Sequence, residues 1–151
     1  MFKKILAPAL VTVAVSLAGC NATNSNPAQV EEPISNEQRL QQLLGEWQVE
    51  DINGAGIIDS SHVTITFDEE GRVYGSTSCN RYSSDYQLTN EGLTFGHSLA
   101  TKMACPEALM NQEQKFLDVF NDINQFEINE TGALILKGKN GKTLRGYLLG
   151  Q

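Results

Sequence analysis

Three cysteines and two histidines carry the most specific side-chain chemistry in this chain of 151 residues. Cys20 follows a short apolar run, whereas Cys79 and Cys105 lie in the second half of the sequence. If the chain is exported, as its first residues indicate, an even pair of cysteines favours a disulfide. Two free buried thiols and a catalytic thiol remain as the alternatives.

The catalytic alternative rests on Cys105, which stands just before a predicted helix whose N-terminus would lower a thiol pKa. A nucleophilic thiol also needs a base such as histidine, and neither His62 nor His97 lies in a recognisable partner motif. The sequence contains no nucleotide-binding loop, dinucleotide fingerprint, zinc-ligand spacing or Ser-His-Asp pattern. We therefore predict no catalytic residues, no metal, no cofactor and no enzymatic activity.

The amino terminus predicts export. Residues 1–19 combine a basic start at Lys3 and Lys4, an apolar run and the small residues before Cys20, which describe a signal peptide. The run is too short to span a membrane, which takes about 20 residues. Leu17-Ala18-Gly19-Cys20 resembles the lipobox of bacterial lipoproteins, which implies lipid on Cys20; an ordinary signal with an incidental cysteine is the alternative.

This reading predicts a membrane contact through the amino-terminal lipid. Residues 20–36 hold the lipidated cysteine and a polar, proline-containing tether that cannot fold alone. By resemblance to the sorting rules of Gram-negative lipoproteins, Asn21 after the cysteine implies the outer membrane, with the protein facing the periplasm.

The charge of the chain restricts its partners. The net charge is −7, and removal of residues 1–19 takes away two lysines and no acid, which leaves −9. Such a surface is unsuited to nucleic acid or to anionic headgroups, both of which attract basic residues. An envelope protein is a possible partner, and a basic one would suit this charge.

Alternating apolar and polar residues predict several half-buried strands. Residues 63–67 and 72–76 form one predicted hairpin, because a turn containing Gly71 separates them. The other predicted strands span residues 45–50, 86–88, 93–95, 126–128, 133–136 and 143–148. Aromatic residues on these segments are expected in the core: Trp47, Phe67, Tyr74 and Phe95.

Two segments have helical periodicity instead. Residues 106 to about 124 place apolar residues, Ile123 included, on one face, with Pro106 at the first helical position. A shorter helix is expected over residues 36–44, with Asn36 as its cap and Gly45 as its end. We predict a mainly β (α+β) domain over residues 37–151, a small antiparallel barrel-like sheet with one main helix.

Three ordered motifs between residues 43 and 148 resemble the META domain family. The segment from Gly75 to Tyr82 resembles the family signature G-x-x-G-C-N-x-Y/F, with Ser78 where the family often has glycine. The segment 100–106 resembles its T-x-M-A-C-P motif, and residues 44–47 with 52–54 resemble its opening strand and turn. Ser84 also replaces a family glycine. The motif residues are Gly75, Cys79, Asn80, Tyr82, Thr101, Met103, Cys105 and Pro106.

The resemblance implies a compact β-rich domain with one helix, no established catalytic residues, and a link to stress and antibiotic tolerance. It implies a non-enzymatic envelope lipoprotein that supports such tolerance. The alternative is a periplasmic inhibitor of lysozyme or a protease, or a small-ligand binder. A deep apolar cavity would favour ligand binding, and a filled barrel would favour contacts through the surface. Asn80 is expected to adopt left-handed geometry or bond its own backbone. Arg81 is expected to be an exposed residue that packs through its stem, with an anchor for an acidic partner as the alternative.

Overall fold

The computed structural model describes residues 34–150. The predicted signal peptide, the lipidation site Cys20 and almost all of the tether lie outside the described residues. No helix in the described part is long and apolar enough to cross a membrane.

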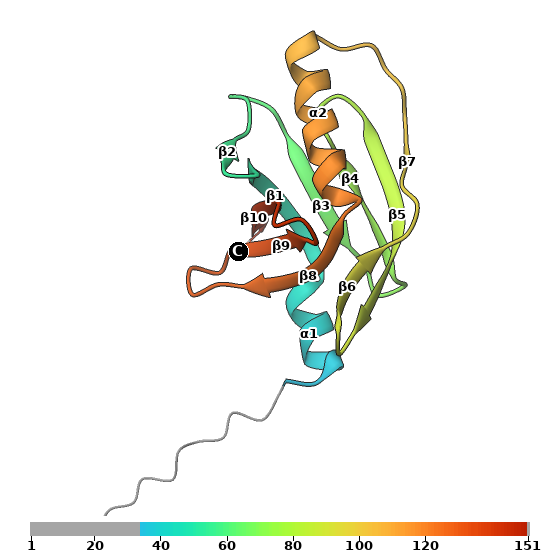
Figure 1. Cartoon of the computed structure of the whole chain (residues 1–151), viewed down its shortest axis with the longest axis vertical. Helices are drawn as coiled ribbons and strands as arrows, with labels where there is room; N and C mark the ends of the chain where they lie inside the picture. Colours follow the sequence, from blue (N-terminus) through green and yellow to red (C-terminus); the bar gives the residue numbers. More distant parts are fainter. Residues whose placement is uncertain (1–33, 151) are drawn as a thin grey trace, which may run out of the picture. The chain divides into compact units, whose positions relative to one another are not determined.

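Two helices and ten strands make up the described chain (Figure 1). In order they are α1 (Asn36–Leu43), β1 (Gly45–Ile52), β2 (Ala55–Gly56), β3 (Val63–Phe67), β4 (Arg72–Ser76), β5 (Arg81–Thr89), β6 (Gly92–Phe95), β7 (Leu99–Ala100), α2 (Glu107–Phe120), β8 (Ile123–Ile128), β9 (Leu134–Gly138) and β10 (Thr143–Leu148).

The strands form one antiparallel sheet that curls almost into a barrel. Its order is β6-β5-β4-β3-β1-β10-β9-β8, with β2 added to β1 and β7 added to β5. The two end strands, β6 and β8, lie against each other. A Cβ on Gly92 in β6 would stand 2.2 Å from the carbonyl oxygen of Asn124 in β8, so only glycine allows this approach. The predicted mainly β, barrel-like fold is confirmed.

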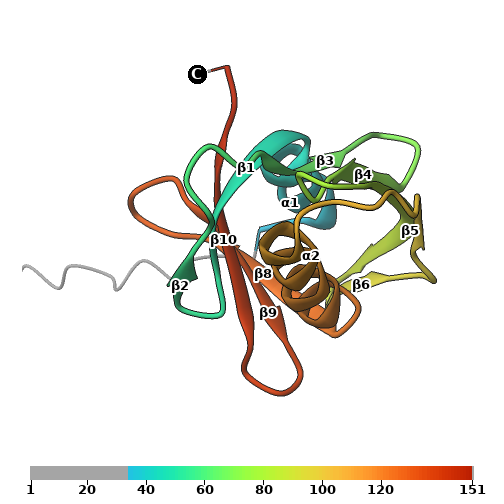
Figure 2. The ribbon, with the colours of Figure 1, turned by 90° about the horizontal axis from the view of Figure 1, so that it is seen from above.

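The helices lie at the two ends of the curled sheet. In Figure 1, α1 lies at the lower end and α2 at the upper end, and Figure 2 shows α2 within the curl. Phe116 and Phe120 of α2 are fully buried, and their rings lie 5.2 and 4.9 Å from the ring of Tyr82 in β5. Burial of this apolar face supplies most of the stability of such a helix.

Several boundaries differ from the prediction. The cap of α1 is Ser35 rather than Asn36, because Ser35 and Gln38 form a reciprocal capping box. Pro106 is the cap of α2 and not its first helical residue. The helix ends at Phe120 and not near residue 124. Ile123 is the first residue of β8, and its side chain is buried in the core.

Tyr74 is also not in the core, and its side chain is 41% exposed. Its neighbour Val73 faces inward and is fully buried. Because successive side chains of a strand point to opposite faces, Tyr74 must face outward. Trp47 and Phe67 are buried as predicted, and Phe95 is partly buried against the core.

Candidate functional site

The two cysteines of the domain are joined. Cys79 follows β4 and Cys105 precedes α2, and their sulfurs form a disulfide with the Cα atoms 6.0 Å apart. The predicted disulfide is confirmed, and the alternative of two free thiols is wrong for this oxidised form. The bond ties the start of α2 to the turn between β4 and β5.

Asn80 is the centre of a buried polar cluster beside the disulfide. Its side-chain oxygen accepts hydrogen bonds from the Thr101 hydroxyl and the Met103 backbone N–H, both at 2.8 Å. Its side-chain nitrogen donates to both carboxylate oxygens of Glu113 in α2 at 3.0 Å. Thr77 also donates its hydroxyl to Glu113. The Asn80 amide thus satisfies its hydrogen-bonding capacity by joining three segments.

This arrangement differs from the prediction for Asn80. The residue in left-handed geometry is Ser78, with φ of 75°. Ser78 stands where the META family often has glycine, so the turn keeps a glycine-like backbone although the side chain has changed. The sequence contains no sign of the contact between Asn80 and Glu113, because the two residues lie 33 positions apart.

Gly75 and Tyr82 of the motif occupy opposite positions on β4 and β5. A Cβ on Gly75 would lie 2.0 Å from the Thr64 carbonyl oxygen, so the position has no space for a side chain. Tyr82 is buried, and its hydroxyl donates to that same oxygen at 2.8 Å. Burial raises the pKa of Tyr82 well above 10.0, which keeps the hydroxyl protonated as a donor.

The remaining motif residues line the segment from β7 to α2. Thr101 and Met103 hold the chain against Asn80, and Pro106 caps α2. The Met103 side chain is 63% exposed although its backbone is fixed by Asn80. The eight motif residues therefore come together at one end of the sheet, where they fix the fold.

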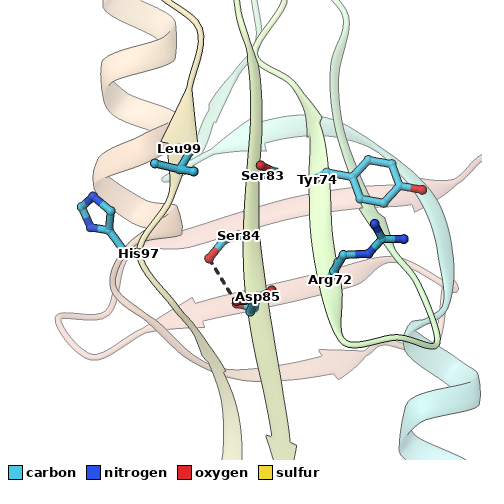
Figure 3. Close-up of a pocket in the computed structure, with 7 residues that line it drawn as sticks. All are labelled: Arg72, Tyr74, Ser83, Ser84, Asp85, His97 and Leu99. Atoms are coloured by element: carbon cyan, nitrogen blue, oxygen red, sulfur yellow. Dashed lines mark hydrogen bonds between the residues drawn. The ribbon is translucent and has the colours of Figure 1, made fainter.

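A solvent-open groove lies next to the motif on the outer face of β4, β5 and β7 (Figure 3). One part has a volume of 510 Å³ and extends from Arg72 and Asp85 to His97. An adjoining part of 440 Å³ reaches Arg81 and Thr101. Tyr74, Ser83 and Leu99 line both parts. Sequence reasoning missed Leu99 and Ser83, because neither belongs to a strong motif.

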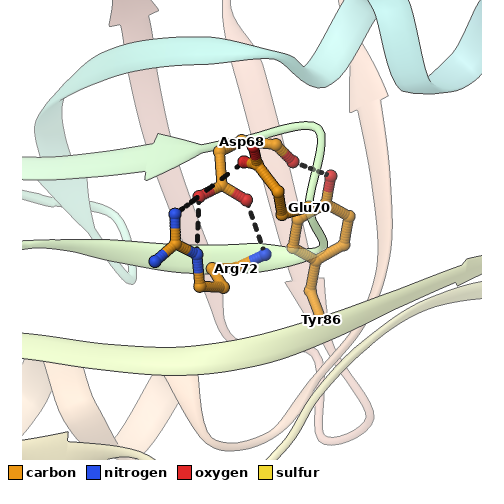
Figure 4. Close-up of polar contacts among 4 residues, drawn as sticks. All are labelled: Asp68, Glu70, Arg72 and Tyr86. Carbon is orange, nitrogen blue, oxygen red and sulfur yellow. Dashed lines mark hydrogen bonds and ion pairs between the residues drawn. The ribbon is translucent and has the colours of Figure 1, made fainter.

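The charge of Arg72 at one end of this groove is compensated within its own hairpin (Figure 4). Its guanidinium lies 2.8 Å from the Asp68 carboxylate and 3.8 Å from that of Glu70. Burial opposes ionisation of Asp68, but the backbone N–H, the charge and the side chain of Arg72 outweigh it and lower the pKa of Asp68 below 3.8. The Tyr86 hydroxyl donates to the Asp68 carbonyl at 2.6 Å, and burial together with the nearby acids raises the pKa of Tyr86 above 10.0.

The histidines do not form a catalytic arrangement with the cysteines among the described residues, since both sulfurs are in the disulfide. His97 lines the groove, and His62 is an exposed residue of the loop before β3. Within residues 34–150, no group of three or more histidine, cysteine or acidic side chains is placed to hold a metal ion.

The interior of the curled sheet is filled by side chains. The space bounded by Trp47, Val49, Ile65 and the leucines of β9 and β10 has no volume open to water. Apolar residues of nearly every strand meet there and around α2 in one cluster. A deep apolar cavity would have favoured ligand binding, whereas a filled interior favours contacts through the surface.

Comparison with known proteins gives one family and several similar folds. The family described as "META domain" matches residues 38–148. A search of curated proteins gives no match. An NMR structure of a protein from Burkholderia xenovorans is 19% identical, with a TM-score of 0.62, and covers 97% of this chain and 100% of its own.

Two further solved structures share the fold. A second NMR structure is 22% identical, with a TM-score of 0.58, and covers 76% of this chain and 95% of its own. A crystal structure of a DUF4847 family protein from Bacteroides vulgatus is 14% identical, with a TM-score of 0.50, and covers 72% of this chain and 94% of its own.

Proposed function

The chain belongs to the META domain family, and from that premise we propose that it is a non-enzymatic lipoprotein of the bacterial envelope that acts through the outer surface of its domain. The lipid on Cys20 would hold it at the outer membrane, facing the periplasm. There it would support tolerance of stress or antibiotics, in keeping with the link that the family resemblance implies.

One observation carries the surface role: the interior of the sheet is filled, while the groove beside the motif is open to solvent. The polar atoms of Asn80 and Glu113 support the same proposal, because they bond to each other and to neighbouring segments. Groups engaged in this way stabilise the domain and are poorly placed to exchange protons with a substrate.

The test uses a deletion strain complemented at matched protein levels. We expect wild-type protein to carry an acylated Cys20 terminus by intact mass and to rescue the stress phenotype. Cys20→Ser should lose the lipid and most of the rescue. His62→Ala, which lies outside the groove, should rescue in proportion to its abundance. A stable, abundant His62→Ala variant without activity would contradict the non-enzymatic role, and a mature terminus elsewhere would contradict the anchor.

Inhibition of a basic envelope enzyme such as lysozyme is the second candidate. The observation that favours it is the net charge of −7, which becomes −9 without residues 1–19. Opposite charge accelerates encounter between proteins, and this attraction weakens with salt. A lysozyme assay with the purified protein at low and at physiological salt tests this candidate directly.

A further inference from the structure

The outer edge of β7 carries backbone groups that no other strand within residues 34–150 uses. Ala100 stands opposite Tyr82, and the Thr101 N–H donates to the Arg81 carbonyl at 3.0 Å. In antiparallel pairing this pattern makes Ala100 and Tyr82 a non-hydrogen-bonded pair, so the N–H and C=O of Ala100 point away from β5. Neither group has a hydrogen-bond partner among residues 34–150.

This edge differs from that of β6, which precedes it on the same side of β5. The edge of β6 is covered by β8, whereas the segment 96–104, which contains β7, is mostly exposed. Between Phe95 of β6 and Leu99 of β7, the register of pairing with β5 shifts by one residue. Exposed strand edges are templates for pairing with another chain. The bare edge at Ala100 can therefore accept an extended segment.

An apolar slot runs beside the edge. Tyr74, Ser83 and Leu99 stand in register across β4, β5 and β7, with the small serine between two large side chains (Figure 3). Leu99 is 68% exposed and Tyr74 is 41% exposed. A side chain of an added strand on this face would contact Leu99, because residues on one face of neighbouring strands contact each other.

The charge near Arg81 favours an acidic occupant, whereas the Asp85 carboxylate lies in the other part of the groove. Arg81 lines the groove and has no ion-pair partner among the described residues. Arg72 at the other end is already paired with Asp68. The chain as a whole carries a net charge of −7, so Arg81 is a local cation on an acidic protein. A carboxylate near Arg81 would form a charge-assisted contact.

We propose that β7 binds an extended segment of a partner protein, which adds a strand at Ala100, places an apolar side chain against Leu99, and directs a carboxylate to Arg81. Peptide recognition of this kind takes affinity from backbone hydrogen bonds and specificity from alternate side chains. This inference rests on the proposed surface role and names the class of partner that the surface recognises.

The test measures binding of labelled peptides to the full-length protein in detergent by fluorescence anisotropy. The probe is a peptide of about ten residues that alternates valine and glutamate. We expect it to bind saturably, and at least about tenfold more tightly than a peptide with lysine in place of glutamate. The same acidic peptide with alternate backbone nitrogens methylated should lose binding, because it keeps its side chains but not its hydrogen-bond donors.

Variants locate the site. Leu99→Ser, Arg81→Gln and Ala100→Pro should each weaken binding several-fold, the last because it removes the outward N–H of β7. Met110→Ser and Arg145→Gln are the matched controls, since they change exposed side chains of the same kinds on α2 and β10. Melting temperatures show which variants are folded, and three independent substitutions keep the test valid if one is not.

Equal binding of the lysine or methylated peptide would overturn the proposal, as would unchanged binding by Leu99→Ser and Ala100→Pro. A dimer seen by light scattering that these two variants dissociate would identify a second copy of the chain as the occupant and would also overturn it. In the deletion strain, full rescue by anchored Leu99→Ser and Ala100→Pro proteins would contradict only this inference. The proposed function would instead be contradicted by an inactive but abundant His62→Ala protein or by a mature terminus other than Cys20.

Discussion

At the scale of single residues, the motif of this domain is explained by space and by hydrogen bonding. Gly75 is required because β3 occupies the place of a side chain, and Asn80 because an amide both accepts and donates. Both roles are structural, although polar motif residues in a cysteine-containing segment are also typical of active sites. The contacts of each atom decide between these two interpretations.

Gly75→Ala should strongly lower stability. The added Cβ would meet the Thr64 carbonyl oxygen at 2.0 Å, so β3 and β4 must separate. We expect a loss of about 1 to 3 kcal/mol or more in the free energy of unfolding, measured with urea. Gly56→Ala is the control, because its nearest atom would be 3.9 Å away. Equal stability of the two variants would show that the strands have room to adjust.

Asn80→Asp tests the amide–carboxylate pair with Glu113. The change replaces a donor by a negatively charged oxygen about 3 Å from another carboxylate, and we expect a loss of about 2 kcal/mol or more. Adding Glu113→Gln should recover much of this loss, because an amide and a carboxylate face each other again with exchanged positions. A double variant no more stable than Asn80→Asp would rule out direct coupling of the two side chains.

At the scale of elements, side chains at the ends of helices and strands set how the segments join. The capping box of Ser35 and Gln38 starts α1, and the disulfide sets where α2 begins. The Asp68–Arg72 pair closes the hairpin of β3 and β4, and Tyr86 of β5 holds the same turn (Figure 4). A substitution in one of these contacts should therefore change stability through that connection between segments.

Reduction of Cys79–Cys105 should lower the melting temperature without abolishing the fold. The bond closes a loop with a sequence separation of 26, which corresponds to about 3 to 4 kcal/mol in the loop-entropy account. Cys79→Ser combined with Cys105→Ser should have a similar effect. Thiol labelling under denaturing conditions should detect neither cysteine until a reductant is added. Labelling without reductant would show that the bond is not formed in solution.

Acid should weaken the β3–β4 turn through Asp68. Its folded-state pKa is lowered below 3.8, so its carboxylate stabilises the fold above that value, and the contribution disappears as pH falls through the folded-state pKa. Asp68→Asn should reduce the loss of unfolding free energy between about pH 5 and pH 2.5. Glu130→Gln, an exposed change in the turn between β8 and β9, is the control. An identical acid response in both variants would contradict the role of Asp68.

At the scale of the whole molecule, the curled sheet surrounds its helix and carries an open groove on its outer face beside the short edge of β7. The most protected strands are those with neighbours on both sides, and β1 lies between β3 and β10 at the middle of the sheet. The groove that we propose as the functional surface is therefore separated in space from the interior that stabilises the domain.

Native-state hydrogen exchange should reveal this separation. We expect the slowest amides in β1, β3 and β10 and fast exchange at Ala100, whose N–H faces away from β5. The measurement is amide exchange by NMR at two pH values, which confirms that exchange follows local opening. Slow exchange at Ala100 in the isolated monomer would mean that its N–H has a partner, and would remove the basis for strand addition there.

Local sequence patterns were sufficient to predict many of the helices and strands, the disulfide and the family of this protein. Alternation in β3, β4 and β10 and the helical spacing of Phe116 and Phe120 predicted the element types, because both patterns depend on residues a few positions apart. The pairing of Cys79 with Cys105 was predicted from the number of cysteines and the expected export of the chain, and the structure contains this disulfide. The META motifs identified the family from residues 43–148, and the family match spans residues 38–148.

Tertiary structure decided the rest. The contact of Asn80 with Glu113, the exposure of Tyr74 and the free edge of β7 depend on how strands distant in sequence pair and how the sheet closes around α2. Ile123 illustrates the limit of local sequence patterns. It fitted the helical spacing, but in the structure it is a buried residue of strand β8. A local pattern specifies which side chains avoid water, whereas register and closure determine which atoms they meet.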